Sequence, residues 1–126
     1  MRVITKFGGT SLGSGERIDR AADSIAAVAE AGHEIAVVAS AMGDTTDELL
    51  DATAFDADER DEAEIVSMGE RTSVRLLKAA LSARGIESVF LEPGHPEWPI
   101  VTNEMGEVLP EETRRRAQKL AQTLGD

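Results

Sequence analysis

Apolar positions along the chain form short continuous runs that alternate with stretches of helical spacing. Residues 3–6 begin with β-branched side chains and lead into two glycines, which predicts a short strand ending in a tight turn. Residues 14–30 repeat apolar side chains every three or four positions and predict a helix, and Gly32 stands where a helix C-terminal glycine belongs. Residues 35–39 (IAVVA) are continuously apolar, which is typical of a strand buried on both faces of a parallel sheet. Together they predict a βαβ unit.

Helical patterns continue after the second strand. Thr45 and Glu48 fit a capping box that opens a helix through Leu50. A charged stretch then leads into a longer helix, expected at residues 62–83 and ended by Gly85. Both helices follow the predicted βαβ unit, with a charged stretch rather than a strand between them.

The C-terminal third is less regular. Residues 88–91 predict a third strand, and residues 100–102 predict a short strand after a proline-rich segment. A proline followed by acids opens a last predicted helix at residues 110–124, which Gly125 would close. Alternating strands and helices indicate an α/β fold, and 126 residues suffice for one compact unit.

The chain is strongly acidic, with a net charge of −11 from 24 acidic and 13 basic residues. Phosphate surfaces would repel such a chain, which disfavours nucleic acid and anionic membranes as partners. Many acids, few lysines and abundant alanine indicate a halophile, because an acidic surface keeps a protein soluble in concentrated salt. The alternative is an ordinary acidic cytoplasmic protein.

Several classes of chemistry are excluded by composition. The chain has no cysteine, which rules out disulfides, thiolate catalysis and zinc–thiolate sites. His33 and His95 are far apart and have no partner at metal-ligand spacing, so no metal site is expected. No stretch approaches the ~20 apolar residues that cross a bilayer, and the N-terminus lacks the apolar segment of a signal peptide. We therefore expect a cytoplasmic protein.

The first candidate site is the loop of residues 6–11 (KFGGTS), directly after the first predicted strand. Glycines let a ligand approach the backbone, and the start of the following helix attracts anions. Lys6 adds a positive charge, and Thr10 and Ser11 add hydroxyl donors. The loop matches neither the P-loop nor the dinucleotide fingerprint. It is either a phosphate-binding loop or a tight turn whose lysine points to water.

Two further segments could carry chemistry. Residues 40–46 follow the second predicted strand, where open α/β sheets place ligands, although a threonine there could simply cap a helix. Glu70 falls on a predicted apolar helix stripe, where a carboxylate needs a partner. It could receive a ligand ammonium, pair with a nearby arginine, or lie at an edge open to water. Gly69 in mid-helix costs about 1 kcal/mol against alanine, which indicates close packing.

These segments, in this order, resemble the aspartate kinase family of the amino-acid kinase superfamily. Residues 6–11, 40–49 (SAMGDTTDEL) and 67–71 (SMGER) match three family signatures. Residues 99–103 (PIVTN) look like a fourth segment, with Asn103 where the family usually has aspartate. The resemblance covers the whole chain.

The resemblance implies transfer of the γ-phosphate of ATP, as its Mg²⁺ complex, to the β-carboxylate of L-aspartate, which opens lysine, threonine and methionine synthesis. Lys6 would stabilise the transferring phosphoryl group, and Ser40 would line its path. Thr46 and Glu70 would hold aspartate, with Glu70 facing the ammonium. Positioning and charge neutralisation are the main demands of such a reaction. The loop around phosphate and substrate would consist of Gly8, Gly9, Thr10 and Ser11.

The resemblance also implies an incomplete three-layer αβα fold with a mainly parallel sheet. Residues 1–126 would be the N-terminal portion of the kinase domain, without the nucleotide-binding half and the regulatory ACT domains. The isolated chain is therefore expected to be inactive, or to depend on a homo-oligomer or a complementing chain. The alternatives are another superfamily kinase, acting on glutamate, acetylglutamate or carbamate, and a non-catalytic binding or regulatory subunit.

Overall fold

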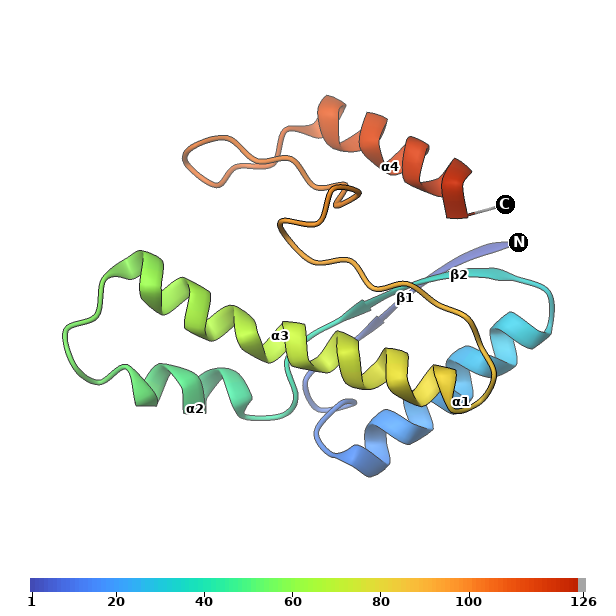
Figure 1. Cartoon of the computed structure of the whole chain (residues 1–126), viewed down its shortest axis with the longest axis horizontal. Coiled ribbons are helices and arrows are strands. Elements are labelled where there is room, and N and C mark those ends of the chain that lie inside the picture. Colours follow the sequence, from blue (N-terminus) through green and yellow to red (C-terminus); the bar gives the residue numbers. More distant parts are fainter. Residues whose placement is uncertain (125–126) are drawn as a thin grey trace. The chain divides into compact units, whose positions relative to one another are not determined.

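The computed structural model describes residues 1–124, and these fall into two compact units, Met1–Phe90 and the described part of Leu91–Asp126. The first unit holds two strands and three helices, and the second holds one helix (Figure 1). In chain order the elements are β1 (Arg2–Phe7), α1 (Gly15–Glu30), β2 (Glu34–Ala39), α2 (Thr45–Ala52), α3 (Glu59–Ser82) and α4 (Pro110–Leu124).

The two strands form a parallel pair joined through α1, which confirms the predicted βαβ unit. Their register runs from Arg2 opposite Glu34 to Phe7 opposite Ala39, and the two end residues Arg2 and Glu34 also form an ion pair. Both carboxyl ends therefore lie at the same edge of the sheet. The predicted α/β class with a parallel sheet is confirmed.

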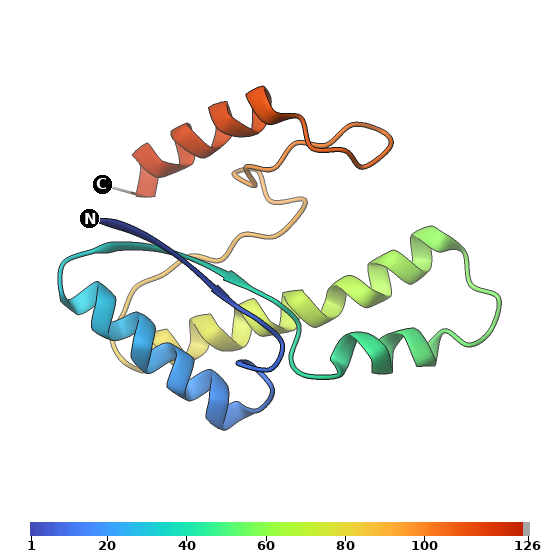
Figure 2. The same cartoon turned by 180° about the vertical axis from the view of Figure 1, so that it is seen from behind.

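The core of the first unit lies between the sheet and the helices α1 and α3, which lie on the same side of the strands in both views (Figures 1 and 2). Since successive strand residues point to opposite faces, every second residue faces these helices. The side chains are aliphatic apart from Phe7, as a composition with 3% aromatic residues requires. The buried cluster consists of Leu12, Ile18, Ala21, Ala22, Ile25, Leu77 and Leu81, with Phe7, Ile35, Val37 and Ala39 packed against it.

The other face of the sheet is open, so the prediction that residues 35–39 are buried on both faces is wrong. Ile4 is 80% exposed and Val38 is 52% exposed, and burial alternates along both strands. The apolar run of residues 35–39 predicted burial on both faces, but within Met1–Phe90 the helices α1 and α3 cover only one face of the strand pair. Apolar side chains on the second face need a covering layer that this unit does not supply.

One arginine ties α1 to α3. Arg84, just past the end of α3, donates to the carboxylates of Asp19 at 2.6 Å and Asp23 at 2.8 Å. It also donates to the backbone carbonyls of Asp19 and Ala80. The hydrogen bonds to Asp19 and then Asp23 raise the pKa of Arg84 above its ordinary value. These contacts, here called the Arg84 clamp, join segments more than 60 residues apart in sequence.

The predicted helix ends are largely confirmed. Gly32 and Gly85 have positive φ angles of 89° and 76°, which favour glycine after a helix C-terminus. Helix α3 ends at Ser82 and begins at Glu59, three residues before the predicted start. The earlier start follows from Asp58, whose side chain accepts the N–H of Arg60 and caps the helix.

The predicted capping box at the start of α2 is wrong. Thr45 is already the first helical residue, and Asp44 occupies the capping position without a side-chain hydrogen bond. The N–H of Glu48 donates to the backbone carbonyl of Asp44, as in any first helical turn. The spacing of Thr45 and Glu48 matches a capping box in sequence. The helix, however, is capped at Asp44, one residue before the position that the motif would require.

The predicted strand at residues 88–91 does not form, although the helix at 110–124 is confirmed. Residues 100–102 contribute only an isolated antiparallel bridge, from Thr102 to Val108. In the second unit, Thr113 in the first turn of α4 accepts the N–H of Val101 through its side-chain oxygen at 2.9 Å. Gly125 lies outside the described residues. Among the residues described, no helix is both long and apolar enough to cross a bilayer.

Candidate functional site

Two loops meet where the parallel strands end. The first, residues 8–14, leads from β1 into α1, and the second, residues 40–44, leads from β2 into α2. The N–H of Ser40 donates to the carbonyl of Phe7 at 3.1 Å, and the N–H of Gly43 donates to that of Gly9 at 2.9 Å. The first two of the three predicted functional segments are therefore hydrogen-bonded to each other.

The loops pack so closely that a side chain at Gly9 would be crowded. A Cβ atom on Gly9 would lie 3.2 Å from the carbonyl oxygen of Ala41 and 3.4 Å from that of Gly43. Gly43 itself has a φ of 46°, a conformation that other residues rarely adopt. The two glycines thus allow backbone to approach backbone at the end of the sheet.

The third predicted segment reaches the same place through α3. A Cβ atom on Gly69 would lie 2.8 Å from the Cβ of Ala41 and 3.4 Å from the Cγ2 of Thr45. This confirms close packing as the reason for a glycine in the middle of a helix. Gly9 and Gly69 therefore both lie against Ala41 in the second loop, where the three segments meet.

The first loop presents free backbone donors, and the strand before it carries a lysine. Among the described residues, the N–H groups of Gly9, Thr10 and Ser11 donate to no protein acceptor. Thr10 and Ser11 are exposed, as are Gly8 and Lys6. Lys6 lies opposite Val38 on the open face of the sheet and forms no ion pair within the described chain. Unpaired N–H groups and a nearby ammonium are the features that bind anions.

The loop is held by its own buried side chain and by the helix it opens. Leu12 is completely buried, and its N–H donates to the carbonyls of Gly8 and Gly9. Ser14 caps α1 by accepting the N–H of Arg17 at 3.2 Å. Sequence reasoning missed both Leu12 and Arg17. A lone apolar residue among glycines and serines was the available signal for Leu12, since such a residue has to be buried somewhere.

The two predicted aspartate-binding residues differ in solvent exposure. Thr46 is half-buried in the first turn of α2, whereas Glu70 is exposed on α3. The apolar stripe expected to include Glu70 runs instead through Gly69, Ser73, Leu77 and Leu81. Glu70 is therefore open to water, and its role in receiving a ligand ammonium stays a prediction. The sequence neighbours of the two residues, Thr45 and Gly69, are in contact, which brings the start of α2 and the middle of α3 together.

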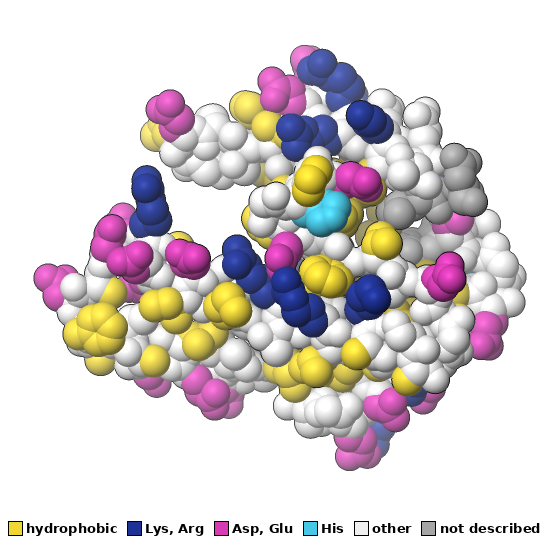
Figure 3. Space-filling model, in the orientation of Figure 1, with side chains coloured by type: hydrophobic (Ala, Val, Ile, Leu, Met, Phe, Trp, Pro, Cys, Tyr) yellow, Lys and Arg dark blue, Asp and Glu magenta, His cyan; other side chains and the backbone are white. Residues whose placement is uncertain are grey.

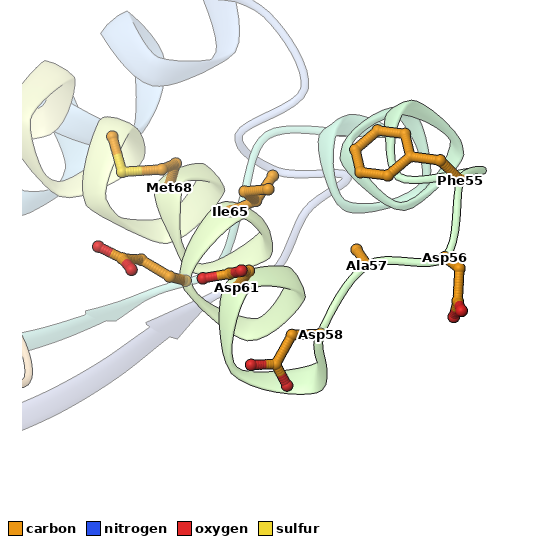
Figure 4. A pocket seen from close by; sticks show the side chains of 8 residues that line it. Phe55, Asp56, Ala57, Asp58, Asp61, Ile65 and Met68 are labelled. Atoms are coloured by element: carbon orange, nitrogen blue, oxygen red, sulfur yellow. The ribbon is translucent and has the colours of Figure 1, made fainter.

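A separate hollow lies at the tip of the α2–α3 hairpin, where hydrophobic side chains gather on the surface (Figure 3). Its volume is about 600 Å³, and its walls combine exposed apolar and acidic side chains from the α2–α3 loop and the first turns of α3 (Figure 4). Gly9, Gly43 and Gly69 do not line this hollow. The lining residues are Phe55, Asp56, Ala57, Asp58, Asp61, Glu64, Ile65 and Met68.

No group of three acidic, histidine or cysteine side chains that could hold a metal ion occurs within residues 1–124. Since ATP brings magnesium bound to its own phosphates, a phosphate-binding loop needs no dedicated protein cage for the ion. The residues present fit this case, because the loop offers donors to phosphate oxygens rather than carboxylate ligands to a metal.

Comparison with known proteins agrees with this geometry. The chain presents free N–H groups and a lysine where a parallel strand leads through a loop into a helix, the repeating unit of α/β proteins. The family model described as "Amino acid kinase family" matches residues 1–123, and the chain belongs to this family. The match extends across both structural units.

Several of the matched proteins are aspartate kinases. The chain is 39% identical to Aspartokinase 2 of Bacillus subtilis over 90 residues and 47% identical to an aspartokinase of Thermus thermophilus over 88 residues. These matches cover 69% and 67% of this chain, but only 22% of either relative. The structure of aspartate kinase from Synechocystis matches with a TM-score of 0.68 at 35% identity, over 72% of this chain and 16% of that one. The chain thus spans about a fifth of the length of these relatives.

Proposed function

We propose that this chain supplies the amino-acid and phosphoryl-transfer residues of an aspartate kinase, which transfers the γ-phosphate of ATP to the β-carboxylate of L-aspartate. The observation that carries the proposal is the convergence of three sequence segments on one edge of the sheet. The packing of Gly9 and Gly69 against Ala41 joins them. The names of the relatives support aspartate as the acceptor.

The first loop would receive the phosphates, bound as the Mg²⁺ complex of ATP. The free N–H groups of residues 9–11 would donate to phosphate oxygens, with the Gly8 backbone open beside them. Lys6 would neutralise the charge on the transferring group, and Ser40, whose backbone is tied to Phe7, would line its path. Phosphoryl transfer depends on positioning and electrostatic stabilisation, and these groups supply both.

Aspartate would bind between α2 and α3. Thr46 would donate its hydroxyl to a substrate carboxylate, and Glu70 would accept the substrate ammonium. Because Glu70 is exposed, it can meet a charged ligand without first losing a protein partner. The product would enter lysine and threonine biosynthesis in the cytoplasm.

The adenine end of ATP would be bound outside these residues, by further protein or by another chain. The sheet face with exposed Ile4 and Val38 supports such an addition, because apolar strand surface is normally covered. The net charge of −11 supports a halophilic setting. We therefore expect the 126-residue chain alone to bind ligands but to turn over no ATP.

Titration followed by NMR tests the proposal directly. Magnesium tripolyphosphate should shift the amide signals of residues 8–11 and 40–44, and L-aspartate should shift those near Thr46 and Glu70. The variant Lys6→Gln should weaken tripolyphosphate binding about tenfold, as expected for loss of a charge-assisted contact, with little effect on stability. Lys119→Gln, an exposed change on α4, is the matched control and should leave binding unchanged.

The choice of amino acid decides between related functions. A stronger response to L-glutamate than to L-aspartate would reassign the chain to a different amino-acid kinase. A hydroxamate assay with ATP, magnesium and L-aspartate at molar salt completes the test. Turnover by the 126-residue chain would contradict the expectation that this chain alone turns over no ATP.

A further inference from the structure

Arg17, in the first turn of α1, reaches back to the glycine loop. Its Nη1 atom donates to the backbone carbonyl of Thr10 at 2.5 Å. The same carbonyl also accepts the N–H of Gly13 at 3.3 Å, so both of its lone-pair directions are used. Arg17 is therefore attached to the middle of the loop that offers its N–H groups to phosphate.

A planar trans peptide links the direction of each carbonyl to that of the next N–H, because the two point to opposite sides. Holding the Thr10 carbonyl toward α1 consequently directs the Ser11 N–H away from it. In the same way, the Gly9 carbonyl accepts from Gly43 and Leu12, which directs the Thr10 N–H. The Gly8 carbonyl accepts from Leu12 and directs the Gly9 N–H, so all three free donors of the loop are oriented by hydrogen bonds to the preceding carbonyls.

The backbone of Arg17 is held by the helix cap. Its backbone N–H donates to the Oγ of Ser14, the capping residue of α1. Within residues 1–124, no carboxylate pairs with its guanidinium. Arg20, one turn further along the helix, instead pairs with Glu16 at 2.6 Å on the exposed surface. The Arg17 contact with the loop therefore faces no competing ion pair.

We propose that Arg17 is the positioning residue of the phosphate loop, fixing through the Thr10 carbonyl the direction of the Ser11 N–H. It acts on the ligand through the backbone and not as a phosphate ligand itself. The inference rests on the proposed function for the identity of the ligand, whereas the loop conformation is measurable in the ligand-free chain.

Two measurements on the 126-residue chain test this role. Amide hydrogen exchange of Leu12 and Gly13, whose N–H groups donate within the loop, reports its conformation without ligand. Titration with magnesium tripolyphosphate reports binding. Arg17→Ala should accelerate exchange at both amides and weaken tripolyphosphate binding, each about tenfold, the effect of losing one charge-assisted hydrogen bond. Arg20→Ala, which removes a cation of the same helix, should change neither beyond about twofold.

Arg17→Lys separates positioning from charge, since lysine keeps the charge but has no planar fork. We expect faster exchange and weakened binding to occur together in this variant. If Arg17→Lys bound tripolyphosphate with wild-type affinity while Leu12 and Gly13 exchanged rapidly, Arg17 would act by charge alone. That result would overturn the proposal. So would an Arg17→Ala chain whose exchange matches the wild type. If the wild-type chain binds no tripolyphosphate, the proposed function fails. Amide hydrogen exchange of Leu12 and Gly13 still decides whether Arg17 holds the loop.

Discussion

Gly69 in the middle of α3 packs directly on Ala41 in the loop after β2. A Cβ atom at Gly69 would lie only 2.8 Å from the Cβ of Ala41, a separation that real Cβ atoms essentially never show. The Ala41 carbonyl in turn lies against Gly9, which belongs to the loop with the free N–H groups. A change at Gly69 is therefore expected to act on the phosphate loop as well as on the helix.

Gly69→Ala should destabilise the chain even though alanine favours helices. Alanine would gain about 1 kcal/mol of helix propensity, but overpacking in a rigid site costs about 1–3 kcal/mol. Ala41 cannot rotate out of the way, because its contacting atom is Cβ itself. We expect a lower free energy of unfolding in urea and shifted amide signals in residues 8–11.

Gly15→Ala is the matched control, because Gly15 is also helical and a Cβ there would meet nothing within 4 Å. This variant should be unchanged or slightly more stable, by up to about 1 kcal/mol. If Gly69→Ala were stabilised to the same extent, the close approach of α3 and the Ala41 loop would not exist in solution.

The Arg84 clamp should be important for joining α1 to α3. Arg84→Met keeps most of the aliphatic stem but removes the hydrogen bonds to Asp19, Asp23 and the two carbonyls. We expect a lower thermal unfolding midpoint, with a smaller loss at molar salt because the ion pairs are partly exposed. Arg20→Met removes an exposed pair within α1 and should leave the midpoint unchanged; an equal loss in both variants would mean that the clamp adds nothing specific.

The pH dependence of this clamp follows from the sign of the arginine shift. The pKa of Arg84 is raised, so its contribution is complete below the ordinary arginine pKa and is lost only as pH rises through the higher folded value. Both lie far above neutrality. The difference in unfolding midpoint between wild type and Arg84→Met should therefore be the same at about pH 7 and about pH 9. A difference that shrank over this range would show that another titrating group controls the contact.

The two N-terminal caps near the site should respond differently to truncation. Ser14 accepts the N–H of Arg17, whereas Asp44 makes no side-chain capping hydrogen bond. Ser14→Ala should therefore cost about 1 kcal/mol of unfolding free energy, and Asp44→Ala less than about 0.5 kcal/mol. Urea unfolding of the two variants provides the comparison. A larger loss for Asp44→Ala would indicate a capping contact that the structure does not contain.

The local sequence pattern was enough to predict helices that end at a glycine. Helix α1 and the glycines at 32 and 85 follow from spacing and from the rarity of positive φ in other residues. The glycine at position 69 was also interpretable, since its cost in a helix requires compensation by packing. The identity of its contact, Ala41, depended on tertiary structure.

Features that depend on which layer covers which face could not be predicted from the local pattern. Val38 belongs to a continuous apolar run, yet it is exposed because α1 and α3 cover the opposite face. Glu70 was assigned to the buried stripe because Val66 and Ser73 share its helical spacing, but the stripe passes through Gly69. Arg17 escaped notice because an arginine in a first helical turn has no distinctive spacing. In each case the decisive information was the position of a second element.

Concentrated salt should stabilise the chain if its acidic surface is an adaptation to a halophilic setting. With a net charge of −11, the folded chain repels itself, and added salt screens this repulsion. The thermal unfolding midpoint should rise between about 0.1 M and about 2 M KCl, where the Debye length falls well below the spacing of most surface charges. The same titration with Arg84→Met separates the general effect from the loss of a local attractive pair. A midpoint that stays constant or falls across this range would make the acidic composition unrelated to salt, and the chain an ordinary acidic protein.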